Sequence, residues 1–163
     1  MCSALSFDIL LLTLHHDFWG ETMQLFNMLE SPFCTKNDLF MIETGLTHTS
    51  EVVVGYSTTA IAVGSGDMPV FATPAMMALM ENAAMLAVKD HLPEGCTTVG
   101  GHIASSHLRP TKVGDTVKAT AEVVKVDGKK ISFKVTAYAD DQLIGEGEHL
   151  RFVVDTEKFL SRL

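Results

Sequence analysis

The segment "AMMALMENAAMLAV" at residues 75–88 limits what this chain can fold into more than any other stretch. Every residue in it is apolar except Glu81 and Asn82, and Glu81 carries its only charge. A helix that is apolar on nearly all sides is buried inside a protein and does not lie on its surface. The rest of the chain must therefore supply a layer that wraps around this helix.

Local signals on both sides set the expected ends of the helix. Thr73 is a good N-cap residue, and Pro74 stands at the first helical position, where proline is tolerated. Pro93 and Gly95 are residues that stop a helix. The sequence therefore predicts a helix from about Pro74 to Leu92.

The last part of the chain has the alternation of an antiparallel sheet. Residues 117–123 and 130–137 place apolar side chains at every second position, with Lys, Glu, Ser or Thr between them. Asp127 and Gly128, between the two segments, are a strong hairpin signal. Residues 143–155 supply a further strand. Together with the buried helix, this curved sheet predicts an α+β fold.

The domain organisation follows from the segments on either side. Residues 47–54 are rich in β-branched side chains and predict an opening strand, and residues 57–63 are expected to continue it or pair with it. Residues 156–163 predict a short terminal helix. We therefore divide the chain into an N-terminal extension at residues 1–40, in which we find no chemical motif, and one domain at residues 41–163.

Charge and cysteine content exclude several classes of protein. The formal net charge of −8 argues against a nucleic-acid partner. Basic residues nevertheless concentrate at residues 109–134, which predicts either solvated strand faces or a patch for a phosphate-bearing ligand. The scattered cysteines form no C-x-x-C pair, so we expect reduced thiols in a cytoplasmic protein and no zinc site. Asp8 interrupts the apolar N-terminal stretch, so we expect no signal peptide and no membrane partner.

Glu81 is the strongest candidate for a chemical role. A carboxylate among apolar side chains is costly to bury unless something nearby uses or satisfies it. It could be a structural carboxylate, satisfied by a polar neighbour such as Asn82 or exposed at a seam between subunits. Alternatively, it faces a cleft, where burial raises its pKa towards the working pH and suits it to general-base or nucleophilic chemistry.

Two further candidates carry weaker local signals. His107 reads as an ordinary strand histidine, and Thr73 is explained as a helix cap. His102 precedes His107 by five residues, so on a regular strand the two point to opposite faces and cannot share a metal ion. No serine-hydrolase elbow, P-loop or dinucleotide fingerprint is present.

Three segments considered together resemble a known family. They are "VFATPAMMALMENAAM", "VGGHIASSHLRPTKVGD" and "GEGEHLRFVVDTEKF". In order and spacing they are similar to the hot-dog-fold acyl-coenzyme A (CoA) thioesterases, specifically the fluoroacetyl-CoA thioesterase-like group, over residues 41–163. The resemblance implies a long helix wrapped by an antiparallel sheet. It also implies an active site at a subunit interface, in a homodimer or a dimer of dimers.

The same resemblance implies an acyl-CoA hydrolase that needs no metal or cofactor, with Thr73, Glu81 and His107 as its catalytic residues. Eight helical residues span about 12 Å, so a Thr73 that caps a continuous helix cannot touch Glu81 directly. A local fold-back, a bridging substrate or water, or the partner subunit could close that gap. The candidate substrate-binding residues are Phe71, Gly100, Gly101, Arg109 and Arg151, with glycine N–H groups for the oxyanion and arginines for CoA phosphates.

One position departs from the family pattern, because the family's aromatic gating residue falls near Asp67 here. We therefore expect a small or medium acyl-CoA substrate and no fluoroacetyl selectivity. Two other functions remain open. A non-catalytic acyl-CoA binding or sensing module on the same fold would not need Glu81. A hydratase would use an Asp/His pair, but Asp67 and His102 lack the spacing of that family.

Overall fold

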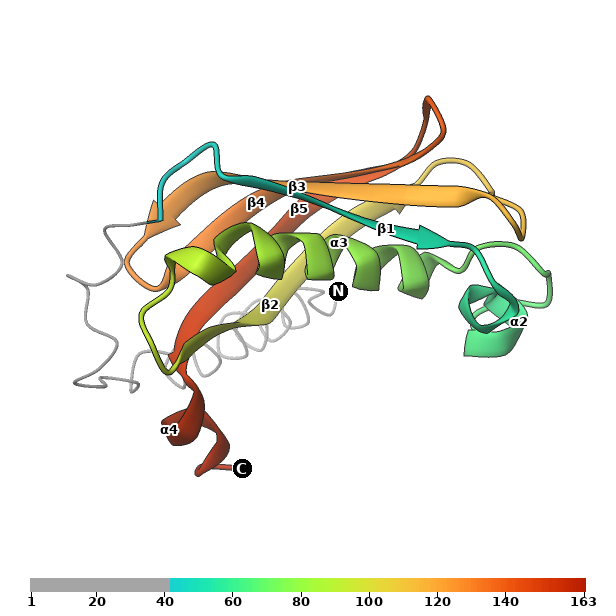
Figure 1. Cartoon of the computed structure of the whole chain (residues 1–163). Helices are drawn as coiled ribbons and strands as arrows, with labels where there is room; N and C mark the ends of the chain where they lie inside the picture. Colours follow the sequence, from blue (N-terminus) through green and yellow to red (C-terminus); the bar gives the residue numbers. More distant parts are fainter. Residues whose placement is uncertain (1–41) are drawn as a thin grey trace, which may run out of the picture.

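The computed structural model describes residues 42–163, in which one antiparallel sheet curves around one long helix (Figure 1). The sheet has five strands in the order β1-β3-β4-β5-β2, and every neighbouring pair is antiparallel. The extension expected at residues 1–40 lies outside the described residues, with Cys2 and Cys34. The strands are β1 (Thr47–Val53), β2 (Cys96–His107), β3 (Thr116–Asp127), β4 (Lys130–Ala139) and β5 (Gln142–Asp155).

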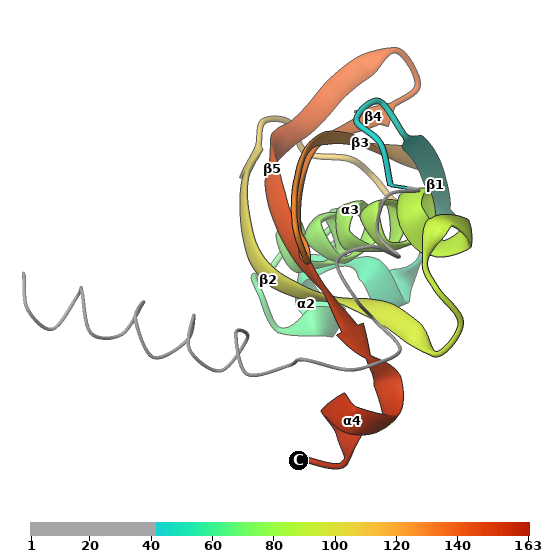
Figure 2. The same ribbon diagram turned by 90° about the vertical axis from the view of Figure 1, so that its left-hand side faces the viewer.

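The long helix α3 (Thr73–Val88) lies along the concave face of this sheet, which curls around it (Figure 2). The side chains of Met76, Met80, Ala83 and Ala84 are fully buried and belong to the same hydrophobic cluster as Phe133 of β4. The apolar character of this helix on nearly all sides predicted that it would be buried, and this prediction is confirmed. The α+β hot-dog architecture is therefore confirmed.

The start of α3 differs by one residue from the expected position. Ala72 is the N-cap residue, Thr73 is the first helical residue and Pro74 follows it, and no side chain caps the helix. At the other end the α-helix stops at Val88 and a 3₁₀ turn, η3 (Lys89–His91), follows. The prediction that Thr73 is the cap was therefore wrong. Its hydroxyl is left to bind another partner.

The predicted alternation of apolar and polar side chains along the sheet strands is confirmed. The apolar residues at 117, 119, 121 and 123 of β3 and at 131, 133, 135 and 137 of β4 are all buried. Gly128, with a φ of 58°, closes the β3–β4 hairpin at the expected place, and Asp140, with a φ of 51°, turns β4 into β5. The terminal helix α4 (Thr156–Leu160) is also as expected, with the Asp155 side chain as its cap.

The segment at residues 57–63 is not a strand, and this prediction was wrong. It forms a 3₁₀ turn, η2 (Tyr56–Thr58), and a short helix, α2 (Ala60–Val63), with a single β-bridge from Thr59 to Phe71. Helix caps at both ends of α2 explain why these residues form a short helix and not a strand. The Thr59 hydroxyl accepts a hydrogen bond from Ala62 N, and Gly64 adopts a left-handed conformation that ends the helix.

Strand β2 forms one edge of the sheet. It pairs with β5 along one side, and no other strand of residues 42–163 pairs with its outer side. A bulge between Gly100 and His102 interrupts the β2–β5 register. Within the described part of the chain, none of the helices is long and apolar enough to cross a membrane.

Candidate active site

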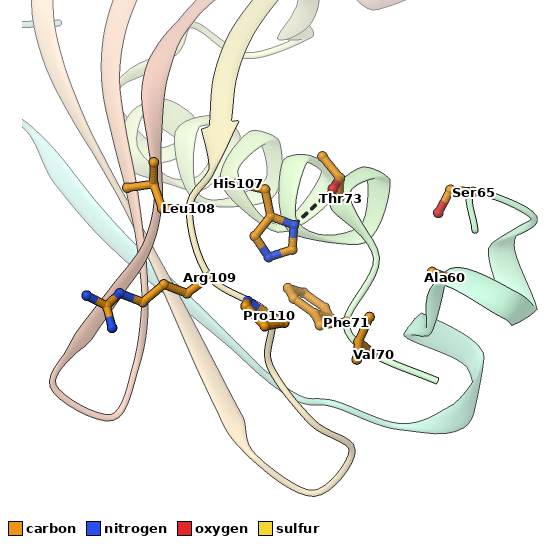
Figure 3. A pocket seen from close by; sticks show the side chains of 9 residues that line it. All are labelled: Ala60, Ser65, Val70, Phe71, Thr73, His107, Leu108, Arg109 and Pro110. Atoms are coloured by element: carbon orange, nitrogen blue, oxygen red, sulfur yellow. Dashed lines mark hydrogen bonds between the residues drawn. The ribbon is translucent and has the colours of Figure 1, made fainter. Parts of the chain in front are cut away.

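A threonine and a histidine meet where α3 begins and β2 ends. Thr73 Oγ1 and His107 Nδ1 are 2.9 Å apart, joined by a hydrogen bond (Figure 3). The two residues are far apart in sequence, and only the packing of α3 against the sheet brings them together. Because the hydroxyl does not cap the helix, it is free to make this bond. A hydroxyl within hydrogen-bond reach of an imidazole is the arrangement used for proton transfer.

A hollow of about 270 Å³ surrounds this Thr73–His107 pair. Phe71 is one of the residues that line this hollow. Its ring is buried and lies edge-to-face with the His107 ring, with the two ring centroids 6.5 Å apart. Figure 3 shows Pro110, Phe71 and Val70 near the imidazole, whereas the Arg109 side chain extends away from it. Apolar side chains and polar ones, among them Ser65, line the hollow in about equal measure.

Burial controls the protonation of His107. Removal of the ring from water lowers its pKa below the usual histidine value of 6.5, and the backbone of Arg109 partly opposes this shift. His107 Nε2 is buried but makes no hydrogen bond of regular geometry. The ring is therefore neutral at neutral pH. With its proton on Nε2, Nδ1 accepts the hydrogen of the Thr73 hydroxyl.

Glu81 lies eight residues further along α3 and faces β2, not the hollow. A Cβ atom added to Gly100 would lie 2.5 Å from Glu81 Oε1, so a larger residue there would force the carboxylate to move from this position. Oε1 also lies 3.6 Å from His149 Nε2, and the Glu81 side chain remains 42% exposed. The carboxylate is thus held against the backbone of the edge strand but is open to solvent.

His149 and Arg151 of β5 form a buried polar cluster behind Glu81. Arg151 donates hydrogen bonds from Nε to Thr98 Oγ1 and from Nη2 to the Thr98 carbonyl, both at 2.8 Å. Its Nη1 atom lies 3.4 Å from the Glu81 carbonyl oxygen and 3.2 Å from His149 Nε2. The sequence analysis missed His149. The signal was available, because residues 149, 151 and 153 of β5 share the inward face.

The remaining expected residues lie in different surroundings. Arg109 is exposed at the hollow, where it can meet a ligand. Arg151 is only 7% exposed and its donors are used internally, so its placement does not favour the expected contact with a CoA phosphate. Gly101 is a glycine for a packing reason, since a Cβ there would come within 2.5 Å of the Phe152 ring. His102 is exposed, and no cluster of metal-ligating side chains occurs within residues 42–163.

One protomer therefore holds two separate groups of candidate residues. Thr73 and His107 meet at the start of α3, whereas Glu81 and His149 meet eight residues along it, about 12 Å away. The structure does not bring Glu81 into contact with the Thr73–His107 pair. Because α3 is continuous, a local fold-back is not the explanation.

Comparison with known proteins identifies the family. The family model described as "Fluoroacetyl-CoA-specific thioesterase" matches residues 54–157. The fluoroacetyl-CoA thioesterase of Streptantibioticus cattleyicolor is 38% identical over 94 residues, which are 58% of this chain and 68% of that protein.

Solved structures agree with this result. A structure of the fluoroacetyl-CoA thioesterase superposes with a TM-score of 0.70 at 33% identity, over 74% of this chain and 94% of the other. A thioesterase superfamily member from Thermus thermophilus superposes with a TM-score of 0.69 at 27% identity, over 74% and 90%. By the family model, the sequence identity and the shared fold, this chain belongs to the fluoroacetyl-CoA-specific thioesterase family.

Proposed function

We propose that this protein is a thioesterase that hydrolyses small or medium acyl-CoA thioesters to the free acid and CoA. The observation that carries the proposal is the hydrogen bond between Thr73 and His107, which lies inside a hollow. Thr73 is on the same helix, α3, as Glu81. Membership of the family supports the reaction class. Solved structures of the fluoroacetyl-CoA thioesterase hold acetyl-CoA in one case and fluoroacetate with CoA in another.

Each residue has a role that its surroundings support. Glu81 attacks the thioester carbonyl carbon, or removes a proton from the water that does so. The carbonyl electron pair moves to oxygen, where backbone N–H groups near Gly100 and Gly101 stabilise it. Collapse of this intermediate breaks the C–S bond and releases the CoA thiolate, which takes up a proton. If water attacked, the free acid forms directly; if Glu81 attacked, an acyl–Glu81 anhydride forms, and water then cleaves it to the free acid and restores the Glu81 carboxylate. The Thr73–His107 pair positions the acyl group and supplies or accepts protons, and Phe71 and Arg109 line the acyl side of the hollow.

We further propose that the active site forms between two subunits. Within residues 42–163 no strand pairs with the outer side of β2, so a second copy of β2 can pair there. A two-fold axis between Ile103 and Ala104 would place Gly100 of one subunit opposite His107 of the partner subunit. Glu81, which lies against Gly100, would then approach the partner subunit's Thr73–His107 pair. This pairing closes the gap between the two groups.

A heterodimer built from two inactive subunits tests this arrangement. One subunit carries Glu81→Ala and the other His107→Ala, and two different tags allow the mixed dimer to be isolated. If the site is shared, one of the two sites regains all its residues, so we expect about half of the wild-type activity. If each site lies within one subunit, the heterodimer is inactive. A monomer in sedimentation analysis would contradict the proposal outright.

The substrate range is tested by thiol release from a panel of acyl-CoA esters of increasing chain length. We expect turnover of small and medium acyl groups, because the hollow of about 270 Å³ is too small for a long chain. Asp67 is exposed and no aromatic side chain stands at its position, so the kcat/KM values for fluoroacetyl-CoA and acetyl-CoA should agree within about tenfold. A much larger preference for fluoroacetyl-CoA would contradict this.

The alternative is a non-catalytic acyl-CoA binding module on the same fold. It would keep the hollow and Arg109 but would not need Glu81 against Gly100. Saturable binding of acyl-CoA without turnover of any ester would favour it. We also infer a cytoplasmic location, because the cysteines are scattered along the chain and form no C-x-x-C pair.

A further inference from the structure

A buried imidazole separates the Glu81 carboxylate from the Arg151 guanidinium. The side chain of His149 has no exposed surface. Its Nε2 atom faces both groups, at 3.6 Å from Glu81 Oε1 and 3.2 Å from Arg151 Nη1. Within residues 42–163, Arg151 forms no ion pair with the Glu81 carboxylate, although it reaches the backbone carbonyl of the same residue at 3.4 Å. The arginine charge is therefore close to Glu81 but is not bonded to its carboxylate.

The neighbours of His149 fix its tautomer. Its Nδ1 atom lies 2.7 Å from the His102 carbonyl oxygen, which can only accept, so Nδ1 carries a proton. Arg151 Nη1 can only donate, so Nε2 offers it a lone pair and carries no proton. The ring is consequently neutral. Burial, the largest cause, lowers the pKa of His149, while the hydrogen bond to the His102 backbone raises it.

Three charged or titratable side chains act on this ring: Arg151 on the same strand, His102 on β2 and Glu81 on α3, whereas β4 contributes the apolar ring of Phe133. Arg151 on β5 and His102 on β2 lower the pKa of His149, and Glu81 on α3 raises it. Protonation of His149 would place a charged N–H group 3.6 Å from Glu81 Oε1 and tie the carboxylate in an ion pair. A carboxylate held in that way is a weaker nucleophile and base.

We propose that His149 is a positioning residue, a neutral spacer that holds Arg151 away from the Glu81 carboxylate. The proposal rests on the proposed function, in which Glu81 is the reacting carboxylate. The other donors of Arg151 are fixed by Thr98, and Nη1 is retained by the accepting Nε2 atom of His149 at 3.2 Å together with the Glu81 carbonyl oxygen at 3.4 Å. The positive charge of Arg151 then acts on the Glu81 carboxylate through space, without a hydrogen bond between the two groups.

The first test is the His149→Phe variant, which keeps a ring but removes both hydrogen bonds. Arg151 Nη1 loses the shorter of its two contacts and can turn from the Glu81 carbonyl oxygen to the Glu81 carboxylate. We expect kcat to fall roughly tenfold to hundredfold with little change in KM. The pH–rate profile should change as well, because the Glu81 carboxylate would then be paired with a guanidinium. A purely structural role would leave this profile in place.

Two further variants separate positioning from folding. His149→Gln retains an oxygen that can accept from Arg151, so we expect it to recover most of kcat. His149→Phe combined with Arg151→Met removes the competing charge, so it should regain activity relative to His149→Phe alone. The matched control is His48→Phe, which makes the same change on β1 at the opposite edge of the sheet. We expect it to leave kcat and the pH profile unchanged.

These variants distinguish failure of the spacer role of His149 from failure of the proposed thioesterase function. If Glu81→Ala is inactive but folded His149→Phe matches the wild type in kcat and pH profile, the spacer role is overturned and the thioesterase site stands. An active Glu81→Ala variant overturns both. If His149→Phe does not fold, the Gln variant decides: a folded His149→Gln protein with a hundredfold loss of kcat would exclude the spacer role.

Discussion

Replacement of Glu81 by Ala is expected to reduce kcat for acyl-CoA hydrolysis by about 10³-fold, the contribution of a well-placed acid–base or nucleophilic group. The fold should survive, because the side chain is 42% exposed and its nearest polar contact, His149 Nε2, is 3.6 Å away. KM should change little, since Glu81 faces β2 and does not line the hollow. Thiol release measures kcat, and circular dichroism with thermal melting measures folding.

The Glu81→Gln variant sharpens this test. Glutamine has nearly the same shape and still fits against Gly100, but its side chain is neither a nucleophile nor a base. We expect it to be as inactive as Glu81→Ala. If Glu81→Gln is active and Glu81→Ala is not, the side chain acts through its shape or its hydrogen bonds. Turnover by both variants would reduce Glu81 to a structural residue.

The sequence predicted the fold well because its periodicities are strong. An apolar helix in the middle of the chain must be covered, and the alternating segments around Ala121 and Phe133 can cover it with one face. The error at residues 57–63 has a local cause. The β-branched residues favoured a strand, but the caps supplied by Thr59 and Gly64 stabilise a short helix instead.

The site was less predictable, for geometric reasons. Thr73 has the chemistry of a helix cap, and only its contact with His107, 34 residues away, reveals a second role. Alternation along β5 could have placed His149 beside Arg151, but the distance of the imidazole from Glu81 depends on how the sheet curls around α3. Local patterns therefore find the candidate residues, whereas three-dimensional packing decides which of them meet.

Replacement of Gly100 by Ala is expected to lower kcat by about 10²-fold, although it removes no functional group. The added Cβ would lie 2.5 Å from Glu81 Oε1 and 3.4 Å from His149 Cε1, so the carboxylate must move. A displacement of about 1 Å at a reacting group costs roughly 10²-fold in rate. We expect kcat to fall by about that factor. The loss of stability should be small, because Gly100 is exposed and has no positive φ.

A matched control is Gly55→Ala, since a Cβ there meets nothing within 4 Å. We expect this variant to behave as the wild type in thiol release and thermal melting. The combined variant Gly100→Ala with Glu81→Ala should be no less active than Glu81→Ala alone, because the added methyl group acts only by displacing the carboxylate. Additive losses would mean that Gly100 contributes by another route, such as the backbone N–H groups that stabilise the oxyanion. Full activity of Gly100→Ala would show that the position of Glu81 against β2 is irrelevant to the reaction.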